Sequence, residues 1–372
     1  MTKASRRKKI EIIYAGGTIS SLTTSQGYRE GGHVMDLMGI FEKKMPYLKS
    51  MVFIGTPIVA FTGLSENIIQ KNWKKMEQCV LRCIEKHPDG ILITHGTDSM
   101  EQTAKYLDAR LRPLLLSKHI PLVLTGANED ITHPKTDAWN NIFFALKRIK
   151  QYSGPGGVYV AFHNRFIPAD FIVKEPFNGF EMNYISKNDG KYNKKIQVRK
   201  RKDDACIARF EKKCIEKIVI PDDAVYEYAV NIVRENHDEL FSYLKSHSVA
   251  VILLVLYHSG TANTKDKTAS VARLVQYLRK TKHILFFGVT ENGEPVDLHS
   301  YETSVALREA GVVPLYTMSG NLARVKLHYR NKRASQREFI QFMLTDIAGE
   351  IDEKKIIQRD KEALLKLYSD KI

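Results

Sequence analysis

The chain has 372 residues and carries 57 Lys and Arg against 42 Asp and Glu, which gives a net charge of +15 at pH 7. Hydrophobic residues make up 43% and charged residues 27%, values near globular averages that exclude intrinsic disorder and a collagen-like repeat. The longest apolar run, residues 249–257, is far shorter than the roughly 20 residues that a membrane-spanning helix needs. Because a single core rarely grows to this size, two domains are expected.

The excess positive charge is concentrated in two segments. Residues 1–9 contain five basic residues and no acid, and residues 186–218 contain twelve Lys or Arg against five Asp or Glu. Charge runs are usually solvated surface, but the second segment could also hold phosphates or an acidic partner. Its only aromatic residues are Tyr192 and Phe210, which give little support for sequence-specific RNA recognition.

A cytosolic location is predicted from the N-terminus and the cysteines. The apolar stretch after the basic N-terminus is too short for the core of a secretory signal, and no small-residue cleavage site follows it. The few cysteines of this long chain form no CxxC pair, so reduced thiols are expected rather than a disulfide framework. They are Cys79, Cys83, Cys206 and Cys214.

Short β-rich runs alternate with helical periods, which predicts βαβ units and a largely parallel sheet. Strands are expected at residues 10–14, 91–94, 121–124, 157–162, 249–256 and 284–289, and two tail helices at 335–345 and 352–368. Two of the intervening helices show an apolar face for the core. These faces are formed by Ile69, Trp73, Met76, Val80 and Cys83, and by Trp139, Phe143, Leu146 and Ile149. The lysine-rich residues 186–217 are expected to end a first domain, 1–218, and a second domain would occupy 219–372.

Two glycines followed by a threonine end the first predicted strand. Gly16 and Gly17 permit positive φ and leave backbone N–H groups unobstructed, which suits a turn that must approach a substrate closely. Thr18 would then present its hydroxyl beyond the strand. Taken alone, the pattern is more often an ordinary turn from strand to loop.

The second predicted strand turns at Gly96 and leads through Thr97 and Asp98 into a helix. In open α/β sheets, ligands bind beyond the carboxyl ends of the strands, where both Thr18 and Thr97 are placed. Asp98 and Glu101 also have the spacing of a capping box, so a purely structural role at the start of the helix is the alternative.

Several motifs, taken in order, resemble those of the asparaginase and glutaminase family. They are Gly-Gly-Thr at 16–18, Gln-Gly-Tyr at 26–28, Ser-Glu-Asn at 65–67, His-Gly-Thr-Asp at 95–98, Thr-Gly-Ala-Asn at 125–128 and a lysine at 174. Each motif is weak alone, but their conjunction is specific. Three motifs near the C-terminus resemble the C-terminal signature of the cytosolic type I L-asparaginases. They are Ala-Gly-Val at 310–312, Met-Ser at 318–319 and Lys-Leu-His-Tyr at 326–329. The resemblance therefore covers nearly the whole chain.

This resemblance implies an α/β fold with two domains, a larger N-terminal sheet domain and a smaller C-terminal flavodoxin-like domain. It implies an amidohydrolase that converts L-asparagine, or L-glutamine, to the acid and ammonia through an acyl-enzyme on a threonine, with backbone N–H groups stabilising the oxyanion. It also implies a homodimer or homotetramer in which the second domain of a neighbour helps to close the pocket.

The resemblance assigns roles to individual residues. Thr18 resembles the nucleophile, and Tyr28 resembles its hydroxyl neighbour on a loop. Thr97, Asp98 and Lys174 resemble the second catalytic group, in which a buried lysine beside an acid can act in a proton relay. The alternative for Lys174, from sequence alone, is an ordinary surface lysine.

The resemblance also places a binding site for a small zwitterion. Ser65 and Glu66 match the pair that holds the α-carboxylate and the α-amine of the substrate, and Asp98 supplies a second acid for the ammonium. Ser65 could instead cap the helix that contains Trp73, which is compatible with binding. The substrate-binding set is Gly17, Ser65, Glu66, Gly96, Thr97 and Asp98.

No metal or other cofactor is expected. The sequence has no HExxH motif, and its histidines are scattered, which is typical of surface or core residues rather than ligands. They include His87, His95, His133 and His163.

A second interpretation comes from departures from the family pattern. Ser-Glu-Asn at 65–67 resembles the archaeal tRNA-dependent amidotransferase subunit that releases ammonia from glutamine. That subunit has an additional N-terminal domain, whereas Gly-Gly-Thr lies close to residue 1 here, which favours a stand-alone enzyme. Thr290-Glu291 stands where type I enzymes tend to have other residues, and the asparagine usual near Thr261 is missing. The choice between asparagine and glutamine as substrate therefore stays undecided. A paralogue that works through RNA or a partner, or that only binds an amino acid, is the third interpretation.

Overall fold

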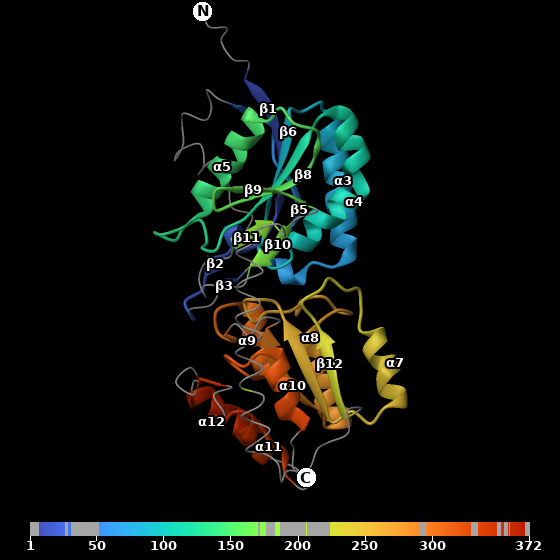
Figure 1. The fold of residues 1–372 in the computed structure, drawn as a ribbon, viewed down its shortest axis with the longest axis vertical. Helices are drawn as coiled ribbons and strands as arrows, with labels where there is room; N and C mark the ends of the chain where they lie inside the picture. The colour runs from blue at the N-terminus through green and yellow to red at the C-terminus, as the bar shows by residue number, and fades with distance from the viewer. Residues whose placement is uncertain are drawn as a thin grey trace, which may run out of the picture. The chain divides into compact units, whose positions relative to one another are not determined.

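The computed structural model describes residues 7–26, 29–30, 52–169, 172–175, 183–186, 206, 224–290, 295–328, 334–347, 351–352, 356 and 358–368. The chain divides into two compact units, residues 1–189 and 190–372. Each has its own sheet with helices packed on it, so the predicted two-domain α/β fold is confirmed (Figure 1). The domain boundary predicted between residues 218 and 219 lies outside the described residues and stays a prediction.

The first unit is built on a sheet with strand order β4-β1-β6-β7-β8-β9, in which β5 also pairs with β1. All of these pairings are parallel except that of β8 with β9. Because Ala15 at the end of β1 is in register with His95 at the end of β6, the residues that follow both strands emerge side by side. The strands are β1 Lys8–Ala15, β4 Val52–Ile54, β5 Ile58–Phe61, β6 Gly90–His95, β7 Pro121–Thr125, β8 Gly157–Phe162 and β9 Arg165–Pro168.

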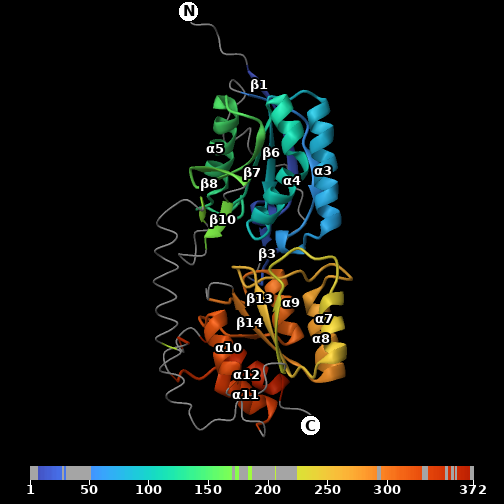
Figure 2. The ribbon, with the colours of Figure 1, turned by 45° about the vertical axis from the view of Figure 1, so that its right-hand side comes forward.

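Helices cover both faces of this sheet, with α3 Gln70–Glu85 and α4 Met100–Lys118 on one side and α5 Ala138–Gln151 on the other (Figure 2). The two predicted apolar helix faces are present, since α3 buries Met76, Val80 and Cys83 and α5 buries Leu146 and Ile149. The aromatic residues of those faces lie at the edge of the core rather than inside it. Trp73, Trp139 and Phe143 are all only partly buried.

Four small elements shape the edge where the parallel strands end. Two 3₁₀ helices, η1 Thr18–Ser20 and η2 Ser65–Asn67, follow β1 and β5. Two antiparallel hairpins lie in the same unit, β2 Leu22–Thr23 with β3 Arg29–Glu30, and β10 Ile172–Glu175 with β11 Asn183–Ser186.

The second unit has a parallel sheet whose strands, β12 to β15, are arranged in chain order. Side chains of β13 alternate between two cores, which explains its continuous apolar run. The first core contains residues of α7 Asp238–Ser246, α8 Val271–Lys282 and α9 Glu302–Ala310, and the second those of α10 Gly320–His328, α11 Gln336–Met343 and α12 Gln358–Leu367. The strands are β12 Val225–Ala229, β13 Val251–Leu256, β14 Leu285–Thr290 and β15 Val313–Pro314.

All six predicted strands are present, with their ends moved by a few residues. The two tail helices are also present as α11 and α12, although α12 begins at Gln358 and is shorter than expected. Every helix within the described ranges is too short or too polar to cross a lipid bilayer.

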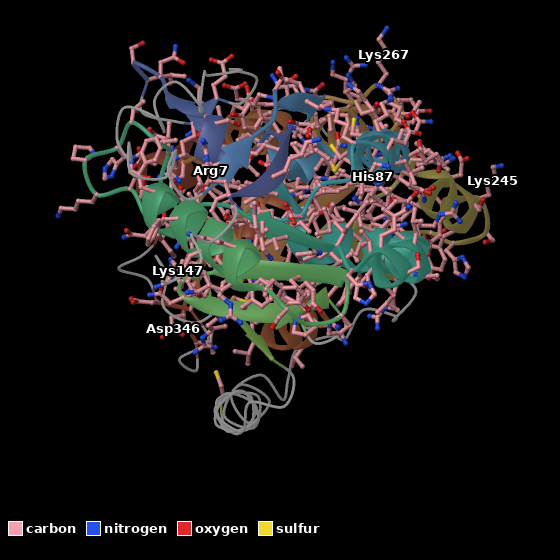
Figure 3. All side chains as sticks on the ribbon, turned by 90° about the horizontal axis from the view of Figure 1, so that it is seen from above. Arg7, His87, Lys147, Lys245, Lys267 and Asp346 are labelled. Carbon is pink, nitrogen blue, oxygen red and sulfur yellow. The ribbon has the colours of Figure 1, made fainter. Side chains whose placement is uncertain are left out.

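Charged side chains are exposed in both units. Lys147 on α5 and Lys245 on α7 project outward from the ribbon (Figure 3) and are exposed. The lysine-rich segment 186–217 lies outside the described residues except for Ser186 and Cys206. Its role therefore stays a prediction.

Candidate active site

Three loops meet at the carboxyl edge of the first sheet, and glycines allow the contact. A methyl group on Gly17 would lie 2.1 Å from Cα of Gly96, and one on Gly96 would lie 2.4 Å from Oγ of Ser65. Gly17 also has φ of 86°, a value that favours glycine, and its N–H donates to the carbonyl of Gly63 at 2.7 Å. The residues that follow β1, β5 and β6 are thus packed against one another.

Thr18 follows this contact as the first residue of η1. It is 5% exposed, and the turn around it is closed by two hydroxyls, because Ser21 donates to the Thr18 carbonyl at 2.8 Å and Ser20 to the Gly17 carbonyl at 3.2 Å. The Thr18 hydroxyl itself makes no hydrogen bond to any residue that the structure describes. Its backbone is held in place while its side chain keeps its donor and acceptor capacity.

Lys174 reaches the start of α4 from the hairpin strand β10. Its Nζ donates to Oδ1 of Asp98 at 2.6 Å, and its backbone N–H donates to Oε2 of Glu101 at 2.8 Å. The Lys174 and Asp98 side chains are only 3% and 6% exposed, so the interpretation of Lys174 as a surface lysine is wrong. Burial of a charged pair is unfavourable unless both charges are matched, as they are here.

The structure also rules out two structural alternatives. The N-cap of α4 is Ser99 and lacks a side-chain cap, so Asp98 and Glu101 do not form a capping box. They bind Lys174 instead. Ser65 does not cap α3, whose N-cap is Ile69. It begins η2, and its carbonyl accepts a hydrogen bond from the Ser99 hydroxyl at 2.7 Å, which joins η2 to the start of α4.

The buried side chain of His95 contacts the backbone of Gly96, the glycine that packs against Gly17 and Ser65. Its Nδ1 lies 2.7 Å from the carbonyl of Gly96, and complete burial lowers the pKa of the ring to about 4, although the hydrogen bond to Gly96 opposes this shift. Its Nε2 has no hydrogen-bond partner in the described part of the chain. His95 is therefore neutral, with Nδ1–H as the donor. From the sequence, His95 was interpreted as an isolated histidine, and only its place as the first residue of the His-Gly-Thr-Asp motif pointed to the site.

The structure buries all of the described polar candidates at this edge. Exposed fractions are 5% for Thr18, 3% for Ser65, 4% for Glu66, 6% for Thr97, 8% for Asp98 and 4% for Lys174. Tyr28 lies outside the described residues. Within the described ranges, no three His, Cys, Asp or Glu side chains gather as a metal site would require.

The chain has relatives among known proteins. A family model described as "Asparaginase, N-terminal" matches residues 9–199. A Glutamyl-tRNA(Gln) amidotransferase subunit of Methanococcus maripaludis is 24% identical over 376 residues, covering 95% of this chain and 83% of that protein. L-asparaginase of Thermococcus kodakarensis is 26% identical over 351 residues, covering 92% and 99%. The solved structure of L-asparaginase I from Vibrio cholerae has 20% identity and a TM-score of 0.41, covering 93% of this chain and all of that one.

Proposed function

Since the matched family model shows that the chain belongs to the asparaginase family, we propose that it hydrolyses the side-chain amide of L-asparagine with Thr18 as nucleophile. One observation carries the proposal. Lys174 and Asp98 form a buried ion pair beside Thr97, on a loop whose Gly96 touches Gly17 next to Thr18. Perturbed or paired charges in the interior, at the carboxyl edge of a parallel sheet, are typical of catalytic sites.

The chemistry requires help for a weak nucleophile, because an alcohol is hardly ionised at neutral pH. In the proposed reaction, Oγ of Thr18 bonds to the carboxamide carbon and its proton passes to the amide nitrogen. The C–N bond then breaks and ammonia leaves. Water attacks the resulting ester, releases aspartate and restores the hydroxyl. Lys174 and Thr97 carry protons in this scheme, and Tyr28, by family resemblance, assists Thr18.

Substrate recognition needs partners for two opposite charges. Glu66 and Asp98 are buried acids that can hold the α-ammonium of an amino acid, and Ser65 can donate to its α-carboxylate. Gly17 and Gly96 leave the backbone open to close approach. A small zwitterionic amide fits these requirements.

Ammonia release from L-asparagine and from L-glutamine tests the proposal. The comparison is between the wild-type chain, Thr18→Ala, and the control Thr281→Ala, an exposed threonine on α8. We expect Thr18→Ala to lower kcat by at least about 10³-fold and the control to match wild type. Absence of turnover on both amides, or a Thr18→Ala enzyme as active as wild type, would contradict the assignment.

A second candidate function is favoured by relatives named as amidotransferase subunits and by the Ser65-Glu66-Asn67 motif. In this case the same nucleophile would release ammonia from glutamine for a partner acting on tRNA. A preference for glutamine over asparagine would favour this function. So would tRNA binding that weakens steeply with salt and is lost when residues 187–217 are deleted. Failure to bind tRNA at low salt would eliminate a tRNA-bound function. A chain that binds asparagine without turning it over would be a silent paralogue.

The proposal includes a cytosolic location and a homo-oligomer. Cys79 and Cys83 are free and buried, which fits a reducing compartment. Burial raises the pKa of Cys83 to about 12, so this thiol is unreactive. Light scattering on the purified chain would give the oligomer size, and a monomer that is fully active would contradict a pocket shared between subunits.

A further inference from the structure

A short hairpin follows Thr18 in the chain and has few hydrogen bonds of its own. Its strands, β2 and β3, are joined by two residue pairs, Leu22 with Glu30 and Thr23 with Arg29. A two-stranded hairpin is marginally stable in water unless it packs on other elements. The hairpin therefore depends on contacts with the rest of the unit.

Arg29 makes such a contact with the loop between β7 and α5. Its Nη1 donates to the carbonyl of Asn128 at 2.8 Å, and its Nη2 forms an ion pair with the Glu129 carboxylate. The Arg29 and Glu129 side chains are 18% and 34% exposed, so solvent screens this pair less than a fully exposed one. Because the donors of a guanidinium form a planar fork, binding two adjacent residues holds Arg29 in one orientation.

Asp137 holds the two residues that receive Arg29. Its carboxylate accepts hydrogen bonds from the backbone N–H of Asn128 at 2.9 Å and of Glu129 at 3.1 Å, and Nε2 of His163 lies 3.1 Å from its Oδ2. Burial raises the pKa of Asp137, but the hydrogen bonds outweigh it and hold the pKa below its usual value. The carboxylate is therefore charged at neutral pH, and the loop that receives Arg29 is tied down.

We propose that Arg29 and Glu129 are positioning residues for the reaction at Thr18. The inference rests on the function proposed above. Their ion pair joins the hairpin that follows the nucleophile to a loop held by Asp137, and so restricts the conformations of residues 21–26 and 29–30. Each partner lies one residue beyond a family motif, Arg29 after Tyr28 and Glu129 after Asn128, so neither belongs to the assigned set. Loss of the pair should loosen the geometry of attack and slow the chemical step, with substrate binding little affected.

Charge reversal tests the pair in both directions. Arg29→Glu and Glu129→Arg place like charges together, and the double variant restores an ion pair with exchanged partners. Arg29→Gln removes the charge with a smaller perturbation, in case a reversal prevents folding. The matched control is Arg110→Glu, which breaks the exposed pair of Arg110 on α4 with Glu77 on α3.

On the amide that the wild-type enzyme hydrolyses, we expect each single variant to lower kcat about tenfold with KM changed less than about twofold. The double variant should recover to within about threefold of wild type, and Arg110→Glu should equal wild type. Single variants with wild-type kcat, or a double variant no better than the product of the two singles, would overturn the proposal.

Hydrogen exchange separates this inference from the proposed function. Backbone amides of residues 21–26 and 29–30 should exchange faster in each single variant and return to the wild-type rate in the double variant. This measurement applies even if the wild-type chain hydrolyses neither amide, an outcome that would reject the proposed function but would leave the restraint on the hairpin open to test. If neither Arg29→Glu nor Arg29→Gln changes the hydrogen-exchange rates, the Arg29–Glu129 ion pair does not restrict the hairpin, and the proposal is wrong.

Discussion

Nζ of Lys174 donates to Oδ1 of Asp98 at 2.6 Å, between a hairpin strand and the start of a helix that are 76 residues apart in the chain. Both side chains are almost completely buried. The desolvation of such a pair can exceed its Coulombic gain, and apolar replacements of a buried pair are often as stable. We infer that chemistry beside Thr97, rather than stability, accounts for this pair.

Replacing Lys174 by Met should abolish activity and destabilise the fold. The methionine retains most of the side-chain volume but leaves the Asp98 carboxylate buried without its ammonium partner, which costs about 3–5 kcal/mol of unfolding free energy. We expect kcat/KM to fall at least about 100-fold. Steady-state kinetics and urea unfolding measure the two effects, with Lys118→Met, an exposed lysine at the end of α4, as control.

Adding Asp98→Asn to Lys174→Met separates stability from catalysis. The double variant has no buried unpaired charge, so it should regain most of the lost unfolding free energy while remaining inactive. A double variant that regains activity together with stability would show that the pair is only structural.

Gly96→Ala should damage the site through backbone contact alone. The added methyl group would lie 2.4 Å from Oγ of Ser65 and 2.8 Å from Cα of Gly17, so the loops must separate. We expect a loss of about 2–4 kcal/mol in unfolding free energy, together with most of the activity. The control is Gly157→Ala, where the nearest atom would be 3.6 Å away, and it should change stability by less than about 1 kcal/mol. Equal behaviour of the two variants would mean that the close approach is not required.

His95 should make stability depend on pH in a defined window. Burial lowers the pKa of His95 from 6.5 to about 4, so between these values the unfolded chain binds a proton that the folded chain does not. Stability should therefore fall as the pH drops from about 6.5 to 4, by about 3 kcal/mol from this group. His95→Asn keeps a donor for the Gly96 carbonyl and does not titrate. Urea unfolding at several pH values should show a shallower decline for the variant, and parallel curves would contradict the assignment of a neutral His95.

Asp137→Asn should destabilise the loop between β7 and α5. An amide nitrogen in place of Oδ2 sets a donor against the N–H groups of Asn128 and Asn141, which costs about 2 kcal/mol. Because the pKa of Asp137 is lowered in the folded chain, its contribution is present above the ordinary value of 3.8 and is lost as the pH falls through the lower folded value. The difference in unfolding free energy between wild type and variant should thus shrink in strong acid. A constant difference down to the lowest pH at which the chain folds would contradict this.

The six predicted strands could be recognised because each is a short apolar run with turn residues at its ends. The position of Thr18 and Thr97 at the same edge followed from parallel pairing, since the carboxyl ends of neighbouring parallel strands coincide. The convergence of Gly17, Gly96 and Ser65 was indicated only by family motifs, because no local pattern encodes contacts between loops about 30 to 80 residues apart.

Other features had no local signal, or a misleading one. Asp98 and Glu101 have capping-box spacing, yet a tertiary partner, Lys174, takes both carboxylates, and the helix begins at a different cap. The burial of Lys174 depends on a hairpin strand of four residues, too short to show a period. The contact of Arg29 with Glu129 spans 100 residues, so charge patterning along the chain could not reveal it.

In the proposed reaction, the hydroxyl of Thr18 forms the acyl-enzyme. Acid quenching during turnover of L-asparagine, followed by peptide mapping with mass spectrometry, tests it directly. We expect an aspartyl ester on the peptide that contains Thr18, absent from Thr18→Ala and from reactions quenched at time zero. Ammonia release at the wild-type rate with no adduct on that peptide, or an adduct at another residue, would contradict it.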